Sequence, residues 1–395
     1  MKEYFLKELL EIKNGKDHKN ENKGVYPVYG SGGIMRYIDN YLYDDESILL
    51  PRKGTLSNIQ YVKEKFWTVD TTYYTVLNKE KAIPYYLYYY LRLLDLSNLN
   101  SGTGVPSMTF NSYYQIKVKL PNLSTQQKIA SILSALDNKI ELNHQINATL
   151  EEMAKTIYDY WFVQFDFPNK EGKPYKSSGG KMVYNKKLKR EIPEGWEVKK
   201  LKELLFEVKD NIKPTDYKEL PYLPIDKMPL KSLYYFEYEN RIKAKSSLIR
   251  FLEDDILIGA MRVYFHRVCN AISNGISRST MMVLRPFEKT HKNFLLFTIN
   301  RSETIKYASD FSTGSSIPYA KWESSLETFP LSFSNNENIF KKFNKLIDPI
   351  IEEFKINNNQ NQELASLRDW LLPLLMNGQV AVETAEKKVK EKLKS

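Results

Sequence analysis

The sequence predicts an α+β fold in which two mixed α/β domains are each followed by a long helix, so that the chain is an internal repeat. Two observations lead to this prediction. The pentapeptide LKELL occurs at Leu6–Leu10 and again at Leu201–Leu205. A long heptad pattern of apolar residues then follows each copy of the repeated region. We therefore expect two copies of one module, each made of a domain and its helix.

The repeated domains share a short apolar run with an acidic entrance and a basic exit. This run is SILLPRKG at Ser47–Gly54 in the first copy and DILIGAMR at Asp255–Arg262 in the second. Such a run is typical of a buried strand that leads into a basic loop. Further along, Pro106 aligns with Pro318. After Pro84, Tyr and Leu recur at three and four residues, which favours a helix there over a strand.

Both long helices open with a capping signature. The first begins at Ser124 with STQQ, where Gln127 is expected to reach back to the cap, and the second begins at Ser334 with SNNE, where Glu337 has the same role. Each pattern covers about 40 residues, which predicts helices ~60 Å long. Pro349 interrupts an otherwise regular pattern and marks a point where the second helix could bend.

The two apolar positions of each heptad form a seam, and a shift of 211 residues, from Ile129 to Phe340, superposes the two seams. Both seams contain Asn, which either fixes register and partner or marks a soft turn of the helix. The first seam position holds Ile129, Leu136, Asn143, Leu150 and Ile157, then Phe340, Ile347, Phe354 and Asn361; the other holds Ile132, Lys139, Ile146, Met153 and Tyr160, then Phe343, Ile350, Asn357, Leu364 and Leu371.

Composition divides the chain into six parts. The segment between the halves is rich in Lys, Gly, Ser and Pro and has almost no apolar periodicity, which indicates a linker or exposed excursion. The charged C-terminal segment is expected to fray. The parts are a first domain (1–123), a first long helix (124–166), the linker (167–195), a second domain (196–333), a second long helix (334–380) and the tail (381–395).

The bulk composition indicates an acidic partner. Net charge is +10 and 28 residues are Tyr, a residue suited to surfaces that contact a partner. Nucleic acid and an anionic membrane surface are the two candidates, and a Lys-rich proteome is the alternative explanation. Cys269 is the only cysteine, which fits a reducing, cytoplasmic location. The sequence contains neither a signal peptide nor an apolar run long enough to span a membrane.

Catalytic and cofactor motifs are missing from the sequence. It has no Walker A loop and no Asn/Asp-Pro-Pro-aromatic tetrapeptide of a base methyltransferase, and its four His are scattered. Asp348 with Glu353 and Lys355 matches a nuclease signature, but these residues fall in the predicted heptad helix rather than on a sheet. We therefore predict no catalytic residue, no metal ligand and no cofactor. A duplicated basic protein of this kind would contact two separated half-sites on a duplex.

The chain resembles the specificity subunits of type I restriction–modification systems. The strongest matches are YPVYGSGG (Tyr26–Gly33), PRKGTLSN with FWTVDTTYY (within Pro51–Tyr74) and LPNLSTQQKIASILSALDNKIELN (Leu120–Asn143). LEEMAKTIYDYWF with FDFP (within Leu150–Pro168) and IPEGW (Ile192–Trp196) add to it. The resemblance implies two target-recognition domains held apart by two long antiparallel, coiled-coil-like helices with a pseudo-two-fold relation.

The same resemblance implies the partners. Each domain would bind one half of a bipartite target in double-stranded DNA, and the helices would set the spacer and dock two methyltransferase subunits. Motor-nuclease subunits would join for cleavage. The chain itself would not be catalytic. Two other classes remain open: a duplicated nuclease or modification enzyme with its own active site, and a coiled-coil scaffold that binds only proteins.

Polar residues that follow the predicted strands are the candidates for DNA contact. Arg can read guanine, Asn can read adenine, and Lys and Ser mostly bind phosphate. For each of them, the alternative is a solvated surface residue. The candidates are Arg36, Tyr37, Arg52, Lys53, Thr55, Ser57 and Asn58 in the first domain, and Arg262, His266, Arg267, Arg278 and Ser279 in the second.

Overall fold

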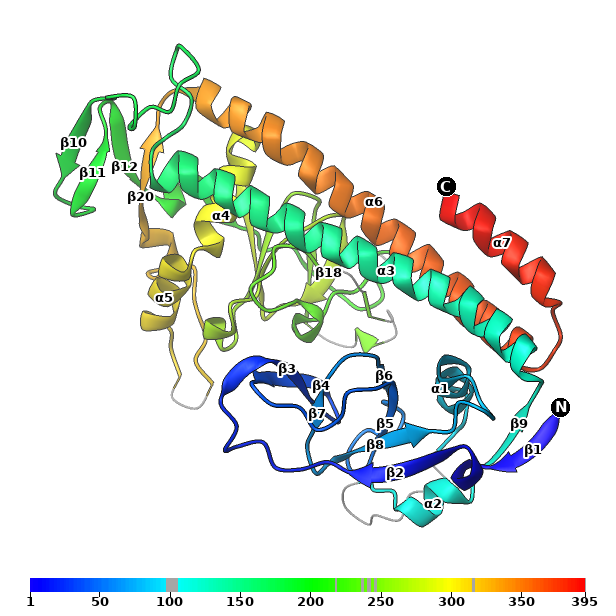
Figure 1. The fold of residues 1–395 in the computed structure, drawn as a ribbon. Helices are drawn as coiled ribbons and strands as arrows, with labels where there is room; N and C mark the ends of the chain where they lie inside the picture. Colours follow the sequence, from blue (N-terminus) through cyan, green and yellow to red (C-terminus); the bar gives the residue numbers. More distant parts are fainter. Residues whose placement is uncertain are drawn as a thin grey trace. The chain divides into compact units, whose positions relative to one another are not determined.

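The computed structural model describes residues 1–96, 106–216, 219–235, 238–239, 243–244, 247–314 and 317–394. The chain forms two compact units: unit 1 is Met1–Leu142 with Asn361–Ser395, and unit 2 is Asn143–Gln360. Each unit combines one mixed domain with a stretch of both long helices, α3 and α6 (Figure 1). The α+β fold predicted from the sequence is confirmed.

Unit 1 is built on the antiparallel sheet β2-β8-β5-β6, beside a β4-β3-β7 sheet and a β1-β9 pair. All five residues of β5 are buried, which explains its unbroken apolar run. The elements are β1 (Lys2–Phe5), η1 (Leu6–Glu8), β2 (Leu10–Asn14), β3 (Lys23–Gly30), β4 (Gly33–Ile38), β5 (Ser47–Pro51), β6 (Gln60–Val62), β7 (Trp67–Thr68), β8 (Thr72–Leu77), α1 (Pro84–Arg92), α2 (Phe110–Tyr114), β9 (Lys117–Leu120), the start of α3 (Leu123–Tyr158), the end of α6 (Glu337–Met376) and α7 (Val382–Lys394).

Unit 2 repeats this plan with the sheet β13-β19-β16-β17, a β14-β15-β18 sheet, a β12-β20 pair and a β10-β11 hairpin. Its elements are a π-turn that continues α3 (Asp159–Val163), β10 (Met182–Asn185), β11 (Arg190–Pro193), β12 (Trp196–Lys200), η4 (Leu201–Glu203), β13 (Leu205–Glu207), β14 (Asn211–Ile212), η5 (Ile225–Lys227), β15 (Leu248–Phe251), β16 (Ile256–Gly259), η7 (Val263–Phe265), β17 (Val268–Asn270), β18 (Gly275–Arg278), β19 (Met281–Pro286), η8 (Lys289–His291), α4 (Lys292–Asn300), α5 (Ser302–Asp310), η9 (Leu326–Thr328) and β20 (Pro330–Ser334).

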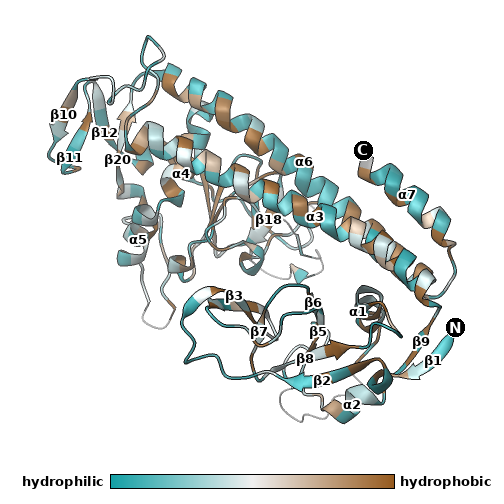
Figure 2. Cartoon of the chain, viewed as in Figure 1, coloured by the Kyte–Doolittle hydropathy of each residue, from teal (hydrophilic) through white to brown (hydrophobic). Residues whose placement is uncertain are grey.

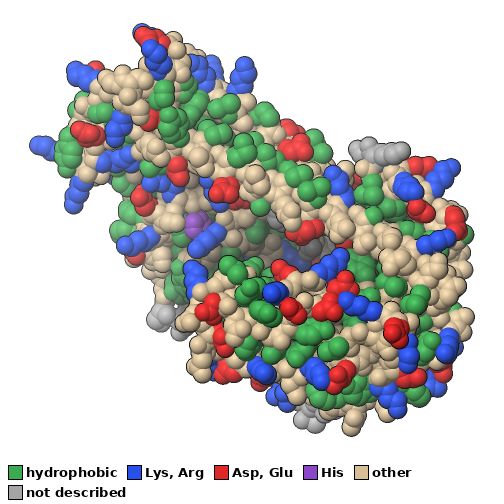
Figure 3. Space-filling view, in the orientation of Figure 1, with side chains coloured by type: hydrophobic (Ala, Val, Ile, Leu, Met, Phe, Trp, Pro, Cys, Tyr) green, Lys and Arg blue, Asp and Glu red, His purple; other side chains and the backbone are tan. Residues whose placement is uncertain are grey.

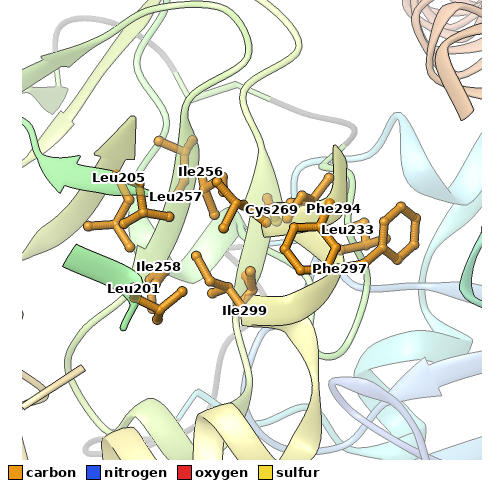
Figure 4. Packing of buried hydrophobic residues seen from close by; sticks show 14 of the residues in the cluster. Leu201, Leu205, Leu233, Ile256, Leu257, Ile258, Cys269, Phe294, Phe297 and Ile299 are labelled. Carbon is orange, nitrogen blue, oxygen red and sulfur yellow. The ribbon is translucent and has the colours of Figure 1, made fainter. Parts of the chain in front are cut away.

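The core of unit 2 lies between its four-stranded sheet and α4. Leu257 on β16 and Cys269 on β17 are fully buried, and Phe294 and Phe297 of α4 are buried in the same cluster (Figure 4). Burial raises the pKa of the Cys269 thiol far above its usual range, so this cysteine stays protonated and behaves as a small apolar residue.

The repeated LKELL has the same structure in both units. Each copy forms a 3₁₀ turn, η1 or η4, that joins the terminal strand pair to the four-stranded sheet. In unit 1 the Phe5 N–H donates to Glu8 Oε2 at 2.7 Å. In unit 2 the Lys200 N–H donates to Glu203 Oε1 at 2.7 Å. The first Leu of each turn is fully buried. The predicted repeat is therefore also a repeat in three dimensions.

The long helices pair antiparallel within each unit (Figure 1). In unit 2 the Asn143 Nδ2 donates to Gln360 Oε1 at 2.7 Å, and the Asn357 Nδ2 donates to Asn147 Oδ1 at 2.8 Å. Asn143, Asn147 and Asn357 are all buried, so the polar seam residues pair across the helices as polar register markers do. Both helices show alternating apolar and polar bands (Figure 2).

Beyond Asn143, the second of the two predicted seam positions of α3 is wrong. Ile146, Met153 and Tyr160 of the second seam position are exposed. From Asn143 onward, the buried positions of α3 and its π-turn are instead 143, 147, 151, 154, 158, 161 and 162. This spacing follows the 3.6-residue period, because α3 contacts the domain of unit 2 as well as α6 and so buries a wider stripe than a two-helix seam.

Both predicted helix caps are wrong by two residues. The first helix is capped by Asn122, whose Oδ1 accepts the Thr125 N–H at 2.8 Å. At the second helix, Asn336 Oδ1 accepts the Asn338 N–H at 3.1 Å. Both motifs do mark a helix start, but a neighbouring Asn, which caps at least as well as Ser, takes the cap position. Glu337 accepts from His291 Nε2 at 2.9 Å instead of reaching back to the cap.

The predicted frayed tail is instead the helix α7. Ala385 and Val389 are buried in the core of unit 1. Val382 and Leu393 extend the same stripe at helical spacing, which the high charge of this segment concealed. The excursion between the halves also has structure: it carries the β10-β11 hairpin, and its Phe167 is buried in the core of unit 2. Among the described residues, no helix combines the length and apolarity needed to cross a membrane.

Candidate nucleic-acid interface

The first predicted DNA-contact loop leaves the four-stranded sheet of unit 1 at the end of β5. The Tyr113 hydroxyl donates to the Pro51 carbonyl at 2.8 Å and closes the buried end of the strand. The Arg52 N–H then donates to Thr71 O at 2.9 Å, and the Gly54 N–H donates to Pro106 O at 2.9 Å. Gly54 has φ +95°, a conformation that favours glycine. These bonds fix the direction in which the loop leaves the sheet.

This loop packs against the Gly-rich turn between β3 and β4. The Asn58 Nδ2 donates to Ser31 O at 2.5 Å, and the Gln60 Nε2 donates to Gly30 O at 3.1 Å. A Cβ added to Gly54 would lie 3.4 Å from Ser31 Oγ. Two segments that the sequence singled out separately therefore form one surface.

The predicted residues of unit 1 fall into two groups. Tyr37, Lys53, Thr55 and Ser57 are exposed. Half-buried residues donate to backbone carbonyls: Arg52 Nη1 to Asp70 O at 3.3 Å, Arg36 Nη2 to Glu21 O at 2.8 Å, and Asn58 as above. An arginine keeps further N–H donors after one such bond, whereas Asn58 uses its amide to hold the loop. Asn58 is thus placed to shape the loop.

In unit 2 the equivalent loop follows β16. The Arg262 N–H donates to Pro318 O at 2.7 Å, as Gly54 does to Pro106 in unit 1. Arg262 also takes positive φ, +50°, at the position that Gly54 occupies in the first copy. The predicted alignment of Pro106 with Pro318 is therefore confirmed by a shared backbone hydrogen bond. A non-glycine residue in this conformation is strained, which is typical of functional positions.

A depression of about 720 Å³ brings three predicted arginines of unit 2 together. The Arg278 Nε donates to the Tyr222 hydroxyl at 3.2 Å, and the Arg267 Nη1 donates to Ile225 O at 2.5 Å. The depression is lined by four cations and two carboxylates, so its charge is positive: Arg262, Arg267, Arg278 and Lys243 against Asp226 and Glu239.

Two further predicted residues of unit 2 differ in exposure. Ser279 is exposed. His266 is buried and its Nε2 lies 2.7 Å from Asn300 O. Burial lowers the pKa of His266, and the nearby Lys155 and Lys231 lower it further, against the opposing effect of the Asn300 carbonyl. This arrangement suits a neutral ring whose Nε2 anchors the loop and is not free to read a base.

Sequence reasoning missed the aromatic and apolar part of this surface. Tyr222, Met261 and Phe265 line the depression beside the arginines. The signal was present as the aromatic pair after GAMR in the sequence. On the face shown in Figure 3, lysine and arginine side chains are scattered among acidic ones, so positive charge does not gather in a single patch there.

An acidic residue on each long helix bonds to a helix of the mixed domain in its unit. In unit 1, Tyr85 and Tyr89 of α1 donate their hydroxyls to Asp137 Oδ2, and Arg368 Nη1 donates to Asp137 Oδ1 at 2.8 Å. Burial and then the charge of Asp137 raise the pKa of the Tyr85 hydroxyl well above its usual range, so it remains a donor. We call Asp137 and its counterpart in unit 2 the clamp carboxylates.

The counterpart is Asp348, which lies 211 residues after Asp137 and superposes on it in the sequence repeat. Asn293 Nδ2 of α4 donates to Asp348 Oδ1 at 2.9 Å, and Lys292 Nζ lies 3.5 Å from the same oxygen. Glu353 is exposed and Lys355 pairs with Glu253 at 2.5 Å. The described part of the chain contains no cluster of three or more His, Cys, Asp or Glu suited to a metal ion.

One protein-family model and several known proteins match the sequence of this chain. The model of the type I restriction modification DNA specificity domain matches residues 1–152. The MjaIX specificity subunit of a type I restriction enzyme from Methanocaldococcus jannaschii is 25% identical over 87% of this chain and 79% of its own length. Over most of its length the chain is similar to specificity subunits of type I restriction enzymes. The HindI specificity subunit from Haemophilus influenzae is 25% identical over 72% of this chain and 73% of its own length.

A solved structure agrees on the fold. The crystal structure of a type I restriction–modification system S subunit from M. genitalium covers 95% of this chain, which in turn covers 95% of that one, with a TM-score of 0.55 and 14% identity. At this identity the likeness shows a shared fold, and the relatives found by sequence are named as specificity subunits of type I restriction enzymes.

Proposed function

We propose that each recognition domain of this specificity subunit binds one half of a bipartite DNA target. The observation that carries this proposal is the duplicated loop, held by the Gly54–Pro106 bond in unit 1 and by the Arg262–Pro318 bond in unit 2. Both loops leave a buried strand of equivalent sheets and carry basic or polar side chains. Because the loops differ in sequence, the two half-sites would differ and the target would be asymmetric.

The long helices would set the spacer between the half-sites. α3 has 36 residues and α6 has 40, without a break at Pro349. At ~1.5 Å per residue, these helices are ~54–60 Å long, which corresponds to about 16–18 base pairs at ~3.4 Å per step. An antiparallel pair that joins both units is therefore suited to act as a ruler.

Two methyltransferase subunits would dock on the helices, and motor-nuclease subunits would join them for cleavage, in the cytoplasm. Support for docking comes from the apolar side chains that the helices leave exposed in unit 2: Ile146 and Met153 of α3, Tyr160 of its π-turn, and Leu346 and Ile356 of α6. Exposed apolar clusters of this kind mark protein interaction sites.

Reconstitution with the methyltransferase subunits of the same system tests the proposal. Methylated motifs on genomic DNA would be mapped for the unaltered complex and for the Arg52→Ala and Arg262→Ala variants. We expect each variant to relax or abolish one half-site, a different one in each case, because a lost bidentate base contact costs about 1–3 kcal/mol. DNA affinity should also fall steeply with salt.

Two outcomes would contradict the proposal. If both variants methylate the original target as before, the loops after β5 and β16 are not the reading loops. If the purified chain methylates or cleaves DNA without any added subunit, it carries an active site of its own and the recognition role is incomplete.

A further inference from the structure

The loop after β16 ends in an exposed aromatic tip. Tyr264 and Phe265 form the single turn η7 and are 50% and 43% exposed. Their rings contact edge to face with centroids 5.0 Å apart. Met261 and Ile317 beside the depression are also exposed, at 38% and 47%. Four large apolar side chains at one place on a basic surface need a partner to cover them.

The tip is held rigidly, although it is exposed. Arg262 before it and His266 after it both have left-handed backbone, with φ +50° and +56°. The buried His266 ring bonds to Asn300 O, and the His266 carbonyl accepts the Lys231 N–H at 2.8 Å. Two strained residues anchored in this way fix the direction of the aromatic pair before any partner arrives.

The charges around the tip favour DNA as the partner. Arg262 adjoins the turn, and the Arg267 guanidinium lies 5.9 Å from the Phe265 ring centroid. Arg278 lines the same depression. Apolar side chains flanked by arginines are the arrangement with which proteins insert between base steps while they bind the adjacent phosphates.

The equivalent loop of unit 1 has a different character. Its exposed side chains are Lys53, Thr55 and Ser57, and they lie on either side of the relaxed Gly54, where unit 2 has a strained arginine. The same backbone position therefore carries a polar loop in one unit and an aromatic tip in the other.

We propose that the Tyr264–Phe265 tip wedges into a base step of the half-site bound by unit 2, so that this half-site is selected partly by how easily the step unstacks. The inference rests on the proposed function and deepens it. Flexible pyrimidine–purine steps would be preferred at the wedge, since they cost less to deform. Unit 1 would select its half-site by polar contacts to the base edges.

A fluorescence experiment tests the wedge. The full chain, in complex with its methyltransferase subunits, is bound to duplexes of the mapped target in which 2-aminopurine replaces one base at a time. The unaltered complex should raise the fluorescence at one step of the half-site assigned to unit 2. Phe265→Ala or Tyr264→Ala should abolish this rise and weaken target binding about tenfold, the scale of a lost stacking contact.

Controls separate a wedge from a fold defect. Phe265→Leu keeps an apolar wedge and should retain the rise. Phe287→Ala removes a 57% exposed phenylalanine that packs against Phe206, outside the depression, and should behave as the unaltered chain. A mismatch placed at the responding step should restore much of the affinity that Phe265→Ala loses, because the step is then already unstacked.

Three results would overturn the inference. Specific target binding with no responding step would remove the wedge and leave the proposed function intact. Loss of a methyltransferase subunit from the Phe265→Ala complex, with the fluorescence rise unchanged, would make the tip a protein contact. A chain that binds no target specifically would fail at the proposed function itself, and the wedge would fall with it.

Discussion

Arg262 is a proposed DNA-contact residue with a strained backbone conformation. Its position in the repeat belongs to Gly54 in unit 1, and both residues adopt positive φ. A left-handed conformation costs a non-glycine residue roughly 1–2 kcal/mol, which the surrounding hydrogen bonds must offset. The conformation of the exposed Arg262 therefore does not stabilise the fold, and we attribute it to the shape that it gives the loop.

Substitutions at these two positions should change the free energy of unfolding in opposite directions. Arg262→Gly should raise the free energy of unfolding by about 0.5–1 kcal/mol, because strain is relieved, while DNA binding weakens. Gly54→Ala should lower it by about 1 kcal/mol, because alanine resists φ +95° and its Cβ would approach Ser31. Urea unfolding of the full chain measures both. A destabilised Arg262→Gly variant would show that the arginine side chain has a structural role.

At the scale of elements, each clamp carboxylate joins a helix of the domain to a long helix through hydrogen bonds. Asp137→Ala should lower the free energy of unfolding by about 2–3 kcal/mol, because Tyr85, Tyr89 and Arg368 lose a shared charged partner. Asp348→Ala should cost about 1 kcal/mol or less, because its main contacts are one amide and one distant lysine at a more exposed site.

Urea unfolding measures which of the two variants loses more free energy of unfolding. Double variants show which contacts cause the loss. Asp137→Ala combined with Arg368→Ala should be much less than additive, since each change removes the same ion pair. Equal losses for Asp137→Ala and Asp348→Ala would argue against the contacts as the cause.

At the level of elements, the sequence predicted the repeat, the helix after Pro84 and the long helices, because apolar periodicity and repeated residues are visible in the chain. It missed α7, whose buried Ala385 and Val389 are too few to stand out among many charges. It also missed the wider stripe of α3 in unit 2, because that stripe depends on which domain face packs against the helix.

The candidate interface was predictable as segments but not as a surface. Basic residues after a buried strand marked both loops. The packing of the Gly-rich turn on the loop through Asn58, the burial of His266 and the exposure of the Tyr264–Phe265 tip depend on backbone angles and distant partners that residue types do not encode. From the residue type alone, a polar side chain that bonds within the loop cannot be told from one that is exposed to solvent.

For the whole molecule, we propose that the paired long helices act as a ruler that spaces two recognition domains. The two units meet in the sequence between Leu142 and Asn143 and between Gln360 and Asn361. On each side of these positions a hydrogen bond joins the two helices within one unit: the Asn143–Gln360 bond on one side and the Asp137–Arg368 bond on the other. Matched insertions here would lengthen the ruler and leave both units intact.

Methylome mapping after such an insertion tests the claim most directly. One helical heptad would be added between Leu142 and Asn143 and another between Gln360 and Asn361, which lengthens the paired helices by about 10 Å and nearly preserves their facing sides. We predict unchanged half-sites separated by a spacer that is longer by up to about three base pairs. Methylation of the original motif with its original spacing would contradict the account.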